Sequence, residues 1–131
     1  MKYILMMHGK EGAWDEYASW SKDDLQRNIE FMHCFNKELH DSGILVDTKG
    51  LAWPQDAIVV RAGNNGEPVT DSVFPESKEF LAGYWVIDVE TSEQAYKIAA
   101  RASAAPGPGG EPANMPIEVR QVLGSHHDLG F

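Results

Sequence analysis

Three side chains could carry acid–base chemistry, because histidine titrates near neutral pH and a carboxylate can orient its ring. His8 ends a short apolar run, His33 lies in the middle of a long helical pattern, and Asp71 precedes the most apolar strand. Strand ends often hold functional groups, since the scaffold fixes them while adjoining loops leave them accessible. We therefore take His8, His33 and Asp71 as the candidate catalytic residues.

Each of these three residues also has an ordinary structural interpretation. His8 could bond a loop carbonyl at the end of its strand, and His33 could be a boundary residue of its helix. Asp71 could accept backbone N–H groups in a turn. The residue types and spacing leave both interpretations open.

Three further residues are candidates for substrate binding. Trp14 lies in the stretch 9–19, which we expect to be a loop, and Glu76 lies in the polar approach to the apolar strand. Arg120 lies in the last strand, where an arginine usually pairs with a carboxylate, and Glu118 points to the same face. With Met, Trp and Tyr side chains, they would line an apolar pocket with few polar groups.

The sequence lacks the motifs that mark the common catalytic classes. It has no phosphate-binding glycine loop, nucleophile elbow, zinc-type cysteine pair or H-E-x-x-H. We expect no cofactor and no metal site. Cys34 has no flanking cation to activate its thiol, so a structural role is expected.

Composition indicates one globular domain. The 131 residues are 43% hydrophobic and 24% charged, and we expect residues 1–124 to form the domain and 125–131 a tail. A net charge of -9 disfavours direct nucleic-acid binding. The apolar runs are too short for a signal sequence or a membrane span, and one cysteine cannot form an internal disulfide. We expect a cytoplasmic protein without a membrane partner.

Two helices are expected. The first begins after Ser21, a favourable N-cap, and stops at Gly43, a left-handed C-terminal position. The second begins after Thr91, and Gln94 stands three residues on, the spacing of a capping box. The first carries one apolar stripe at steps of three and four: Leu25, Ile29, Met32, Phe35 and Leu39.

The strands complete an order β-α-β-β-β-β-α-β. Glycine and asparagine at 63–66 predict a turn, so the two middle strands form an inserted hairpin. The remaining elements form two β-α-β units, which predicts a ferredoxin-like α+β fold, an antiparallel sheet with both helices on one face. The expected strands are 3–7, 44–53, 57–61, 68–71, 80–89 and 117–123.

The strands are apolar on both faces. In the strand from Phe80, Tyr84 and Val86 occupy one face while Trp85 and Ile87 occupy the other. Two helices cover only one face, and a second copy of the chain is the simplest cover for the other. We expect a homodimer in which two sheets pack face to face as a dimeric α+β barrel.

The segment V-T-D-S-V-F-P-E-S-K-E-F-L-A-G-Y-W-V-I-D-V, from Val69 to Val89, resembles the signature of the YCII-related proteins of the DGPF type. The M-K-Y-I-L-M-M start and the final P-I-E-V-R-Q-V resemble the first and last strands of that family. Ser72 and Val73 replace the Gly-Pro of the namesake motif, so we do not carry over the geometry of that loop.

The resemblance implies a dimeric α+β barrel, in agreement with the strand pattern. It also implies enzyme-like relatives with a His–Asp pair, one branch linked with dehydrochlorination, and a group histidine near Met32 or His33. The DGPF branch is associated with extracytoplasmic-function sigma factors.

Two functions follow, and the sequence leaves open whether the protein is an enzyme. One is a small enzyme with lyase or hydrolase-like chemistry, in which His8 or His33 is the base and Asp71 orients it. The other is a non-catalytic ligand sensor or partner of a regulatory protein, which needs the pocket and the dimer alone.

Overall fold

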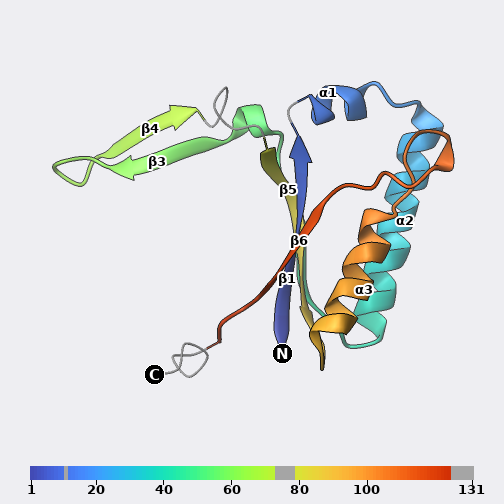
Figure 1. Ribbon diagram of the computed structural model, residues 1–131. Helices are drawn as coiled ribbons and strands as arrows, with labels where there is room; N and C mark the ends of the chain where they lie inside the picture. The colour runs from blue at the N-terminus through green and yellow to red at the C-terminus, as the bar shows by residue number, and fades with distance from the viewer. Residues whose placement is uncertain (11, 73–78, 125–131) are drawn as a thin grey trace.

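An antiparallel sheet with two helices against one of its faces organises the molecule (Figure 1). The computed structural model describes residues 1–10, 12–72 and 79–124. The strand order β2-β5-β1-β6 is that of a ferredoxin-like fold, so the predicted fold class is confirmed. The bounds are β1 Lys2–Lys10, β2 Leu45–Gly50, β5 Glu79–Asp88, β6 Ile117–Gln121, α2 Lys22–Asp41 and α3 Ser92–Ser103.

The predicted hairpin forms a separate two-stranded sheet of β3 (Ile58–Ala62) and β4 (Pro68–Ser72). It projects on the side of the main sheet opposite the helices (Figure 1). At the turn, Gly66 has a left-handed φ of 76° and donates its N–H to Gly63 O over 3.1 Å. The exposed apolar side chains of this hairpin are Ile58, Val60 and Val69.

The stretch 9–19, expected to be a loop, contains the helix α1 (Ala13–Ala18), and this expectation was wrong. β1 also runs on to Lys10. Gly12 has a left-handed φ of 82° just before α1, a conformation that glycine adopts at low cost. Asp15 and Glu16 in the first turn stabilise the positive end of the helix. Six residues are too few to display helical periodicity in the sequence.

The predicted ends of α2 are confirmed. Ser21 Oγ accepts the N–H of Asp24 at 3.1 Å, and Gly43 has a left-handed φ of 77°. Phe35 and Leu39 are buried against the sheet. Ile29, expected in the same stripe, is 48% exposed.

The segment after α3 covers the beginning of α2. It includes a short 3-10 helix, η2 (Pro108–Gly110). Asn28 Nδ2 donates to Pro106 O at 3.1 Å, and the N–H of Gly109 donates to Asp24 Oδ1 at 3.3 Å. The Pro- and Gly-rich segment 106–110 therefore crosses the surface of α2.

The core lies between the sheet and the two long helices. Leu5, Leu39 and Ile87 are its largest fully buried side chains. Trp85 is 5% exposed and meets the ring of Phe35 edge-on, with 5.8 Å between ring centroids. Burial of these side chains joins β1 and β5 to α2 through the hydrophobic effect.

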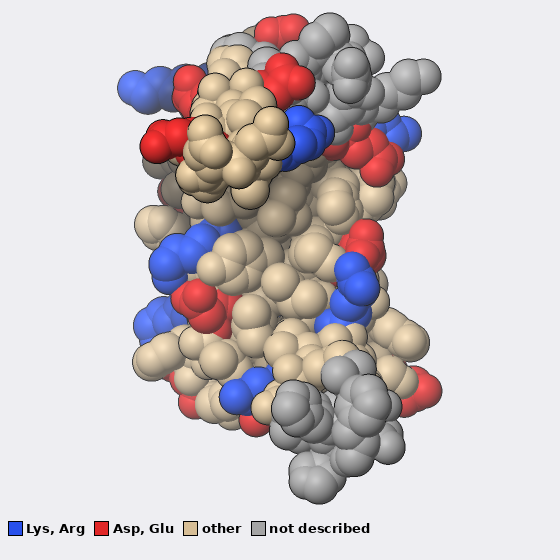
Figure 2. All heavy atoms as spheres, turned by 90° about the vertical axis from the view of Figure 1, so that its left-hand side faces the viewer, with Lys and Arg blue, Asp and Glu red and all other residues tan. Residues whose placement is uncertain are grey.

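Among the residues that the structure describes, no helix covers the other face of the sheet (Figure 1). By strand alternation Ile4, Met6, Tyr84 and Val86 occupy it, and register pairs Ile4 with Val86 and Met6 with Tyr84. Figure 2 looks onto this side of the molecule, where uncharged residues fill the middle and charged residues gather toward the edges. We call these four residues the open face. Among the described residues, no helix has the length and apolar character needed to cross a bilayer.

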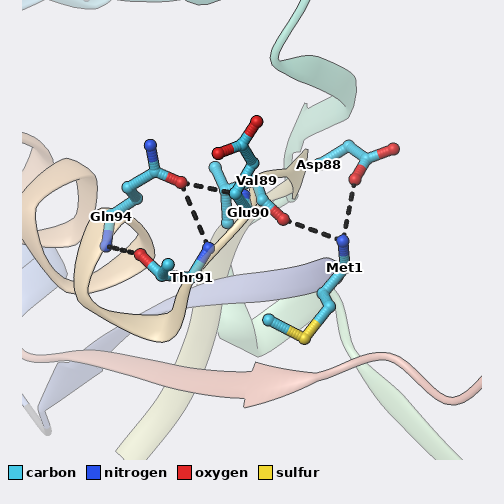
Figure 3. Close-up of polar contacts among 6 residues, drawn as sticks. All are labelled: Met1, Asp88, Val89, Glu90, Thr91 and Gln94. Atoms are coloured by element: carbon cyan, nitrogen blue, oxygen red, sulfur yellow. Dashed lines mark hydrogen bonds and ion pairs between the residues drawn. The ribbon is translucent and has the colours of Figure 1, made fainter.

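A capping box starts α3, as the sequence predicts (Figure 3). Thr91 Oγ1 accepts the N–H of Gln94 at 3.2 Å, and Gln94 Oε1 accepts the N–H groups of Thr91 at 3.1 Å and Glu90 at 2.8 Å. Next to it the amino group of Met1 donates to Val89 O over 2.8 Å. Met1, just before β1, is thereby fixed to Val89, the residue that follows β5.

Replacing the cap tests its contribution. Thr91→Ala removes the acceptor for Gln94 N–H and is expected to lower the free energy of unfolding by about 1 kcal/mol. Thr91→Ser keeps the hydroxyl and should lose less than half of that. Urea denaturation of the three proteins gives the values, and equal losses in both variants would show that the hydroxyl does not cap the helix.

Candidate functional site

A cavity of about 450 Å³ lies on the helix side of the sheet, at the end covered by α1. Its aromatic lining residues are Tyr17, Trp20, Trp53, Phe80, Tyr84 and Trp85. The methionines are Met7, Met32 and Met115, from β1, α2 and the segment before β6. Aromatic walls with adaptable methionines and a few polar groups are typical of small-molecule sites.

Small side chains leave the space open. Ala102 and Ala105, at and just after the end of α3, line the cavity and are buried. Gly83, in β5 opposite Met7, presents no side chain at all. Larger side chains in place of the two alanines would fill the volume, whereas a Cβ at Gly83 would lie 2.9 Å from the backbone oxygen of Lys49.

Three aromatic rings pack together along one wall. The ring of Tyr17 lies 5.0 Å from that of Trp20 and 5.7 Å from that of Trp53, measured between centroids, and both pairs are tilted. Tyr17 comes from α1, Trp20 from the turn after it, and Trp53 from the segment after β2. The wall therefore joins two parts of the chain that are distant in sequence.

The opposite wall is fixed by a hydrogen bond between the sheet and α2. Trp85 Nε1 donates to Asn36 Oδ1 at 2.7 Å. The bond satisfies a buried indole donor and orients the Asn36 amide beside the cavity. Both residues line the cavity.

Trp20 Nε1 is different. The atom is buried and has no hydrogen-bond partner among the described residues, although Trp20 lines the cavity. Buried donors in folded proteins almost always have partners, so an unpaired one beside a cavity is unusual.

A charged group stands on β2. Asp47 pairs with Val86 and Lys49 with Tyr84, so by strand alternation these side chains lie on the same side of the sheet as the open face. Asp47 accepts hydrogen bonds from Lys49 Nζ at 2.7 Å and from the Tyr84 hydroxyl at 3.1 Å. The Lys49 bond, assisted by Tyr84, lowers the pKa of Asp47 below its usual 3.8, and the same carboxylate raises the pKa of Tyr84 and of Lys49. Lys49 and Tyr84 also belong to the residues that line the cavity, and the ammonium group of Lys49 is already compensated by Asp47.

The candidate catalytic residues lie on three different elements. His8 lies on β1, on the same side of the sheet as Met6, and its Nε2 is 3.4 Å from Glu118 Oε1 without hydrogen-bond geometry. His33 is exposed on α2, and Asp71 is exposed on β4, with Val59 as its partner across the hairpin. The helices and the hairpin are on opposite sides of the main sheet (Figure 1). None of these three lines the cavity.

The three candidates for substrate binding are not brought together at the cavity either. Trp14 belongs to α1, but its side chain lies outside the described residues, as does the whole of Glu76. Arg120 is exposed on β6 with its Nε 3.8 Å from Glu118 Oε2, so the pairing expected with Glu118 is present. Arg120 does not line the cavity.

Sequence reasoning missed the residues that do line it. Trp20 stands just before the expected helix without a predicted role, and Trp53 only ends the expected strand 44–53. The available signal was the spacing of Trp14, Tyr17 and Trp20, at steps of three, which is one turn of a helix. Within the described part of the chain, no three His, Cys, Asp or Glu side chains converge in a way that could hold a metal ion.

The ion pair between Asp47 and Lys49 makes a prediction about pH. The pKa of Asp47 is depressed on folding, so its contribution to stability is complete above the unfolded value of 3.8 and is lost as pH falls through the folded pKa. Lys49→Ala should raise the Asp47 pKa toward 3.8, measured by NMR of the carboxyl carbon. Lys97→Ala removes an exposed lysine of α3 and should leave the Asp47 pKa unchanged. A depressed Asp47 pKa that persists in Lys49→Ala would show that Lys49 is not the cause of the depression.

Comparison with known families agrees with this architecture. The family model of the YCII-related domain matches residues 1–122. No curated protein is significantly similar to the chain. The match confirms the YCII-related resemblance, whereas the narrower DGPF type stays a prediction. Because the match covers nearly the whole sequence, the chain belongs to the family of YCII-related domains.

Proposed function

We propose that the protein binds a small, largely apolar molecule in the cavity beside α1. The observation that carries the proposal is the cavity itself, whose volume of about 450 Å³ lies in the range of small-molecule sites. Its aromatic and methionine lining would bury most of such a ligand. Lys49, the one cation among its described lining residues, is paired with Asp47, so the apolar walls would provide most of the affinity.

Binding without catalysis fits the lining better than acid–base chemistry does. Among the described residues that line the cavity, none is a histidine, and Glu16 is the one carboxylate. A proton transfer needs a base within hydrogen-bond reach of the substrate. These observations favour the ligand-sensing function, with a regulatory protein as a proposed partner.

Acid–base catalysis is the second candidate, and His8 supports it. Its Nε2 is buried, unbonded and 3.4 Å from a carboxylate oxygen of Glu118. A neighbouring carboxylate can orient an imidazole ring for proton transfer. This pair lies on the uncovered side of the sheet, away from the aromatic cavity, so a reaction there would need a different site.

We further propose a homodimer formed through the open face. Ile4, Met6, Tyr84 and Val86 form an apolar strip between charged edges, where β6 contributes Glu118 and Arg120. The β3–β4 hairpin leaves on the same side (Figure 1) and carries exposed apolar residues. A two-stranded hairpin is marginally stable alone, so contact with a second copy would stabilise it. The four-stranded sheet is open, and packing two copies face to face would complete a barrel.

Filling the cavity tests the binding function. Met32→Trp places a larger side chain against the cavity and should weaken binding of diphenylmethane by about tenfold or more, since the ligand loses its volume. Equilibrium dialysis gives the affinity. Cys34→Trp adds the same side chain at an exposed position of α2 and should bind as wild type. Absence of wild-type binding, or equal binding by both variants, would contradict a ligand site here.

A charge on the open face tests the dimer. Met6 lies in the middle of this face, between Tyr84 and Glu118 in register. Met6→Glu should raise the dimer dissociation constant by about thirtyfold or more, the effect of losing one strong contact. Tyr96→Glu, an exposed position on α3, should stay dimeric. Light scattering after size exclusion gives the masses, and a wild-type monomer at micromolar concentration would refute the proposal.

A further inference from the structure

The charges beside the open face alternate in sign. Two rows of register partners cross this side of the sheet, each running from β2 through β5 and β1 to β6. One row is Asp47, Val86, Ile4 and Arg120, and the other is Lys49, Tyr84, Met6 and Glu118. Each row has two uncharged residues in its middle and two opposite charges at its ends, and the second row reverses the signs of the first.

These four charges are accessible, and their order is not required by the fold. Between 45% and 71% of each side chain is exposed. In Figure 2, blue lies above red on the left of the uncharged middle, and red lies above blue on the right. Within the chain, Asp47 pairs with Lys49 and Glu118 with Arg120, and exposed pairs of this kind contribute little to stability. Either order of the two charges on a strand would allow such a pair, so the order points to something outside the chain.

A second copy packed on the open face meets this pattern in one of two ways. Packed sheets keep their strand directions within about 30°, so the two-fold axis lies either along the strands or across them. With the axis along the strands, β2 faces the partner's β6 and each row faces the same row. Asp47 then meets the partner's Arg120, and Lys49 meets the partner's Glu118. With the axis across the strands, midway between the rows, Asp47 meets the partner's Lys49.

A third pair of charges distinguishes the two axes. Lys2 of β1 and Asp88 of β5 are register partners and by alternation lie on the same side of the sheet, one step beyond the first row. With the axis along the strands, β5 faces the partner's β1, so Asp88 meets the partner's Lys2. With the axis across the strands, Asp88 faces the beginning of the partner's β5, around the apolar Leu81. Only the axis along the strands gives every one of these charges an opposite charge.

The expected dimensions agree with such pairing. Packed sheets lie about 10 Å apart, a gap that a lysine or arginine facing a carboxylate can bridge. The charged ends of the rows lie on the outer strands, β2 and β6, while the apolar residues lie on β5 and β1. The charges would thus form a solvated rim around an apolar centre, as in other protein interfaces.

We propose that the alternating charges align the two copies of the homodimer, with its two-fold axis along the strands and between β5 and β1. The proposal rests on the proposed homodimer and names how its copies are oriented. The apolar centre provides most of the affinity, and the charges select one register. A shift of one copy by one row would place Asp47 opposite the partner's Glu118, a pair of like charges.

Exchanging the two charges of one strand tests the alignment at constant composition. Asp47→Lys combined with Lys49→Asp keeps the net charge and the pair within β2 but places each charge opposite its own sign. The dimer dissociation constant should rise about tenfold or more, because the change acts at both symmetric edges of the dimer. Glu118→Arg combined with Arg120→Glu makes the same exchange on β6 and should have a similar effect.

The variant that carries both exchanges is the matched control. Every charge again meets its opposite, so the dissociation constant should return to within about threefold of the wild type. A loss caused by misfolding would not be reversed when the second exchange is added. Sedimentation equilibrium of the four proteins gives the constants.

The outcomes separate this proposal from the homodimer itself. A wild-type monomer would reject both. A wild-type dimer that tolerates the β2 exchange would reject the alignment and leave the homodimer intact. Failure of the combined variant to recover would also overturn the alignment.

Salt gives a second readout. Raising NaCl from about 0.1 M to about 1 M shortens the Debye length from about 10 Å to about 3 Å. The ratio of dissociation constants between the β2 exchange and the wild type should then shrink severalfold, because both attraction and repulsion are screened. A ratio that salt does not change would overturn the proposal.

Discussion

The hydrogen bond from Trp85 Nε1 to Asn36 Oδ1 is the interaction on which the arrangement of this protein depends. β5 pairs with both β1 and β2, and Trp85 joins this central strand to α2. The indole is almost fully buried, so its donor must be satisfied, and the amide of Asn36 satisfies it only when α2 has one particular rotation and height. The edge-on contact between the rings of Trp85 and Phe35 is a second link between β5 and α2.

The cavity follows from what surrounds that contact. α2 continues past the part of the sheet that α3 protects, and alanines line the region where α3 ends. α1 and the segment around Trp53 close over the remaining gap with aromatic rings rather than aliphatic chains. These rings pack around a space without filling it. The hydrophobic core and the cavity are thus neighbouring parts of one layer. They differ in whether the surrounding side chains are large enough to fill the space.

The elements of the fold could be predicted from the sequence because their signals are local. Ser21, Gly43 and the Thr91–Gln94 pair act on backbone groups within four residues, and the structure has each of them where the sequence indicates. The site could not be predicted in this way. Periodicity reports which residues are buried, but it does not report which buried residues border empty space. α1 has too few residues for a period, and His8, chosen for its position at a strand end, faces the side of the sheet without helices.

Three of the four tryptophans, Trp20, Trp53 and Trp85, border the same small volume. The intrinsic emission of the protein is therefore dominated by one locality rather than averaged over the chain. A change in emission during denaturation would report first on the opening of the wall formed by α1, and only later on the loss of the sheet. The unfolding curve followed by tryptophan fluorescence would then differ from the curve followed by far-ultraviolet circular dichroism, without any stable intermediate in the core. The separation between the two midpoints would measure how independently the wall opens.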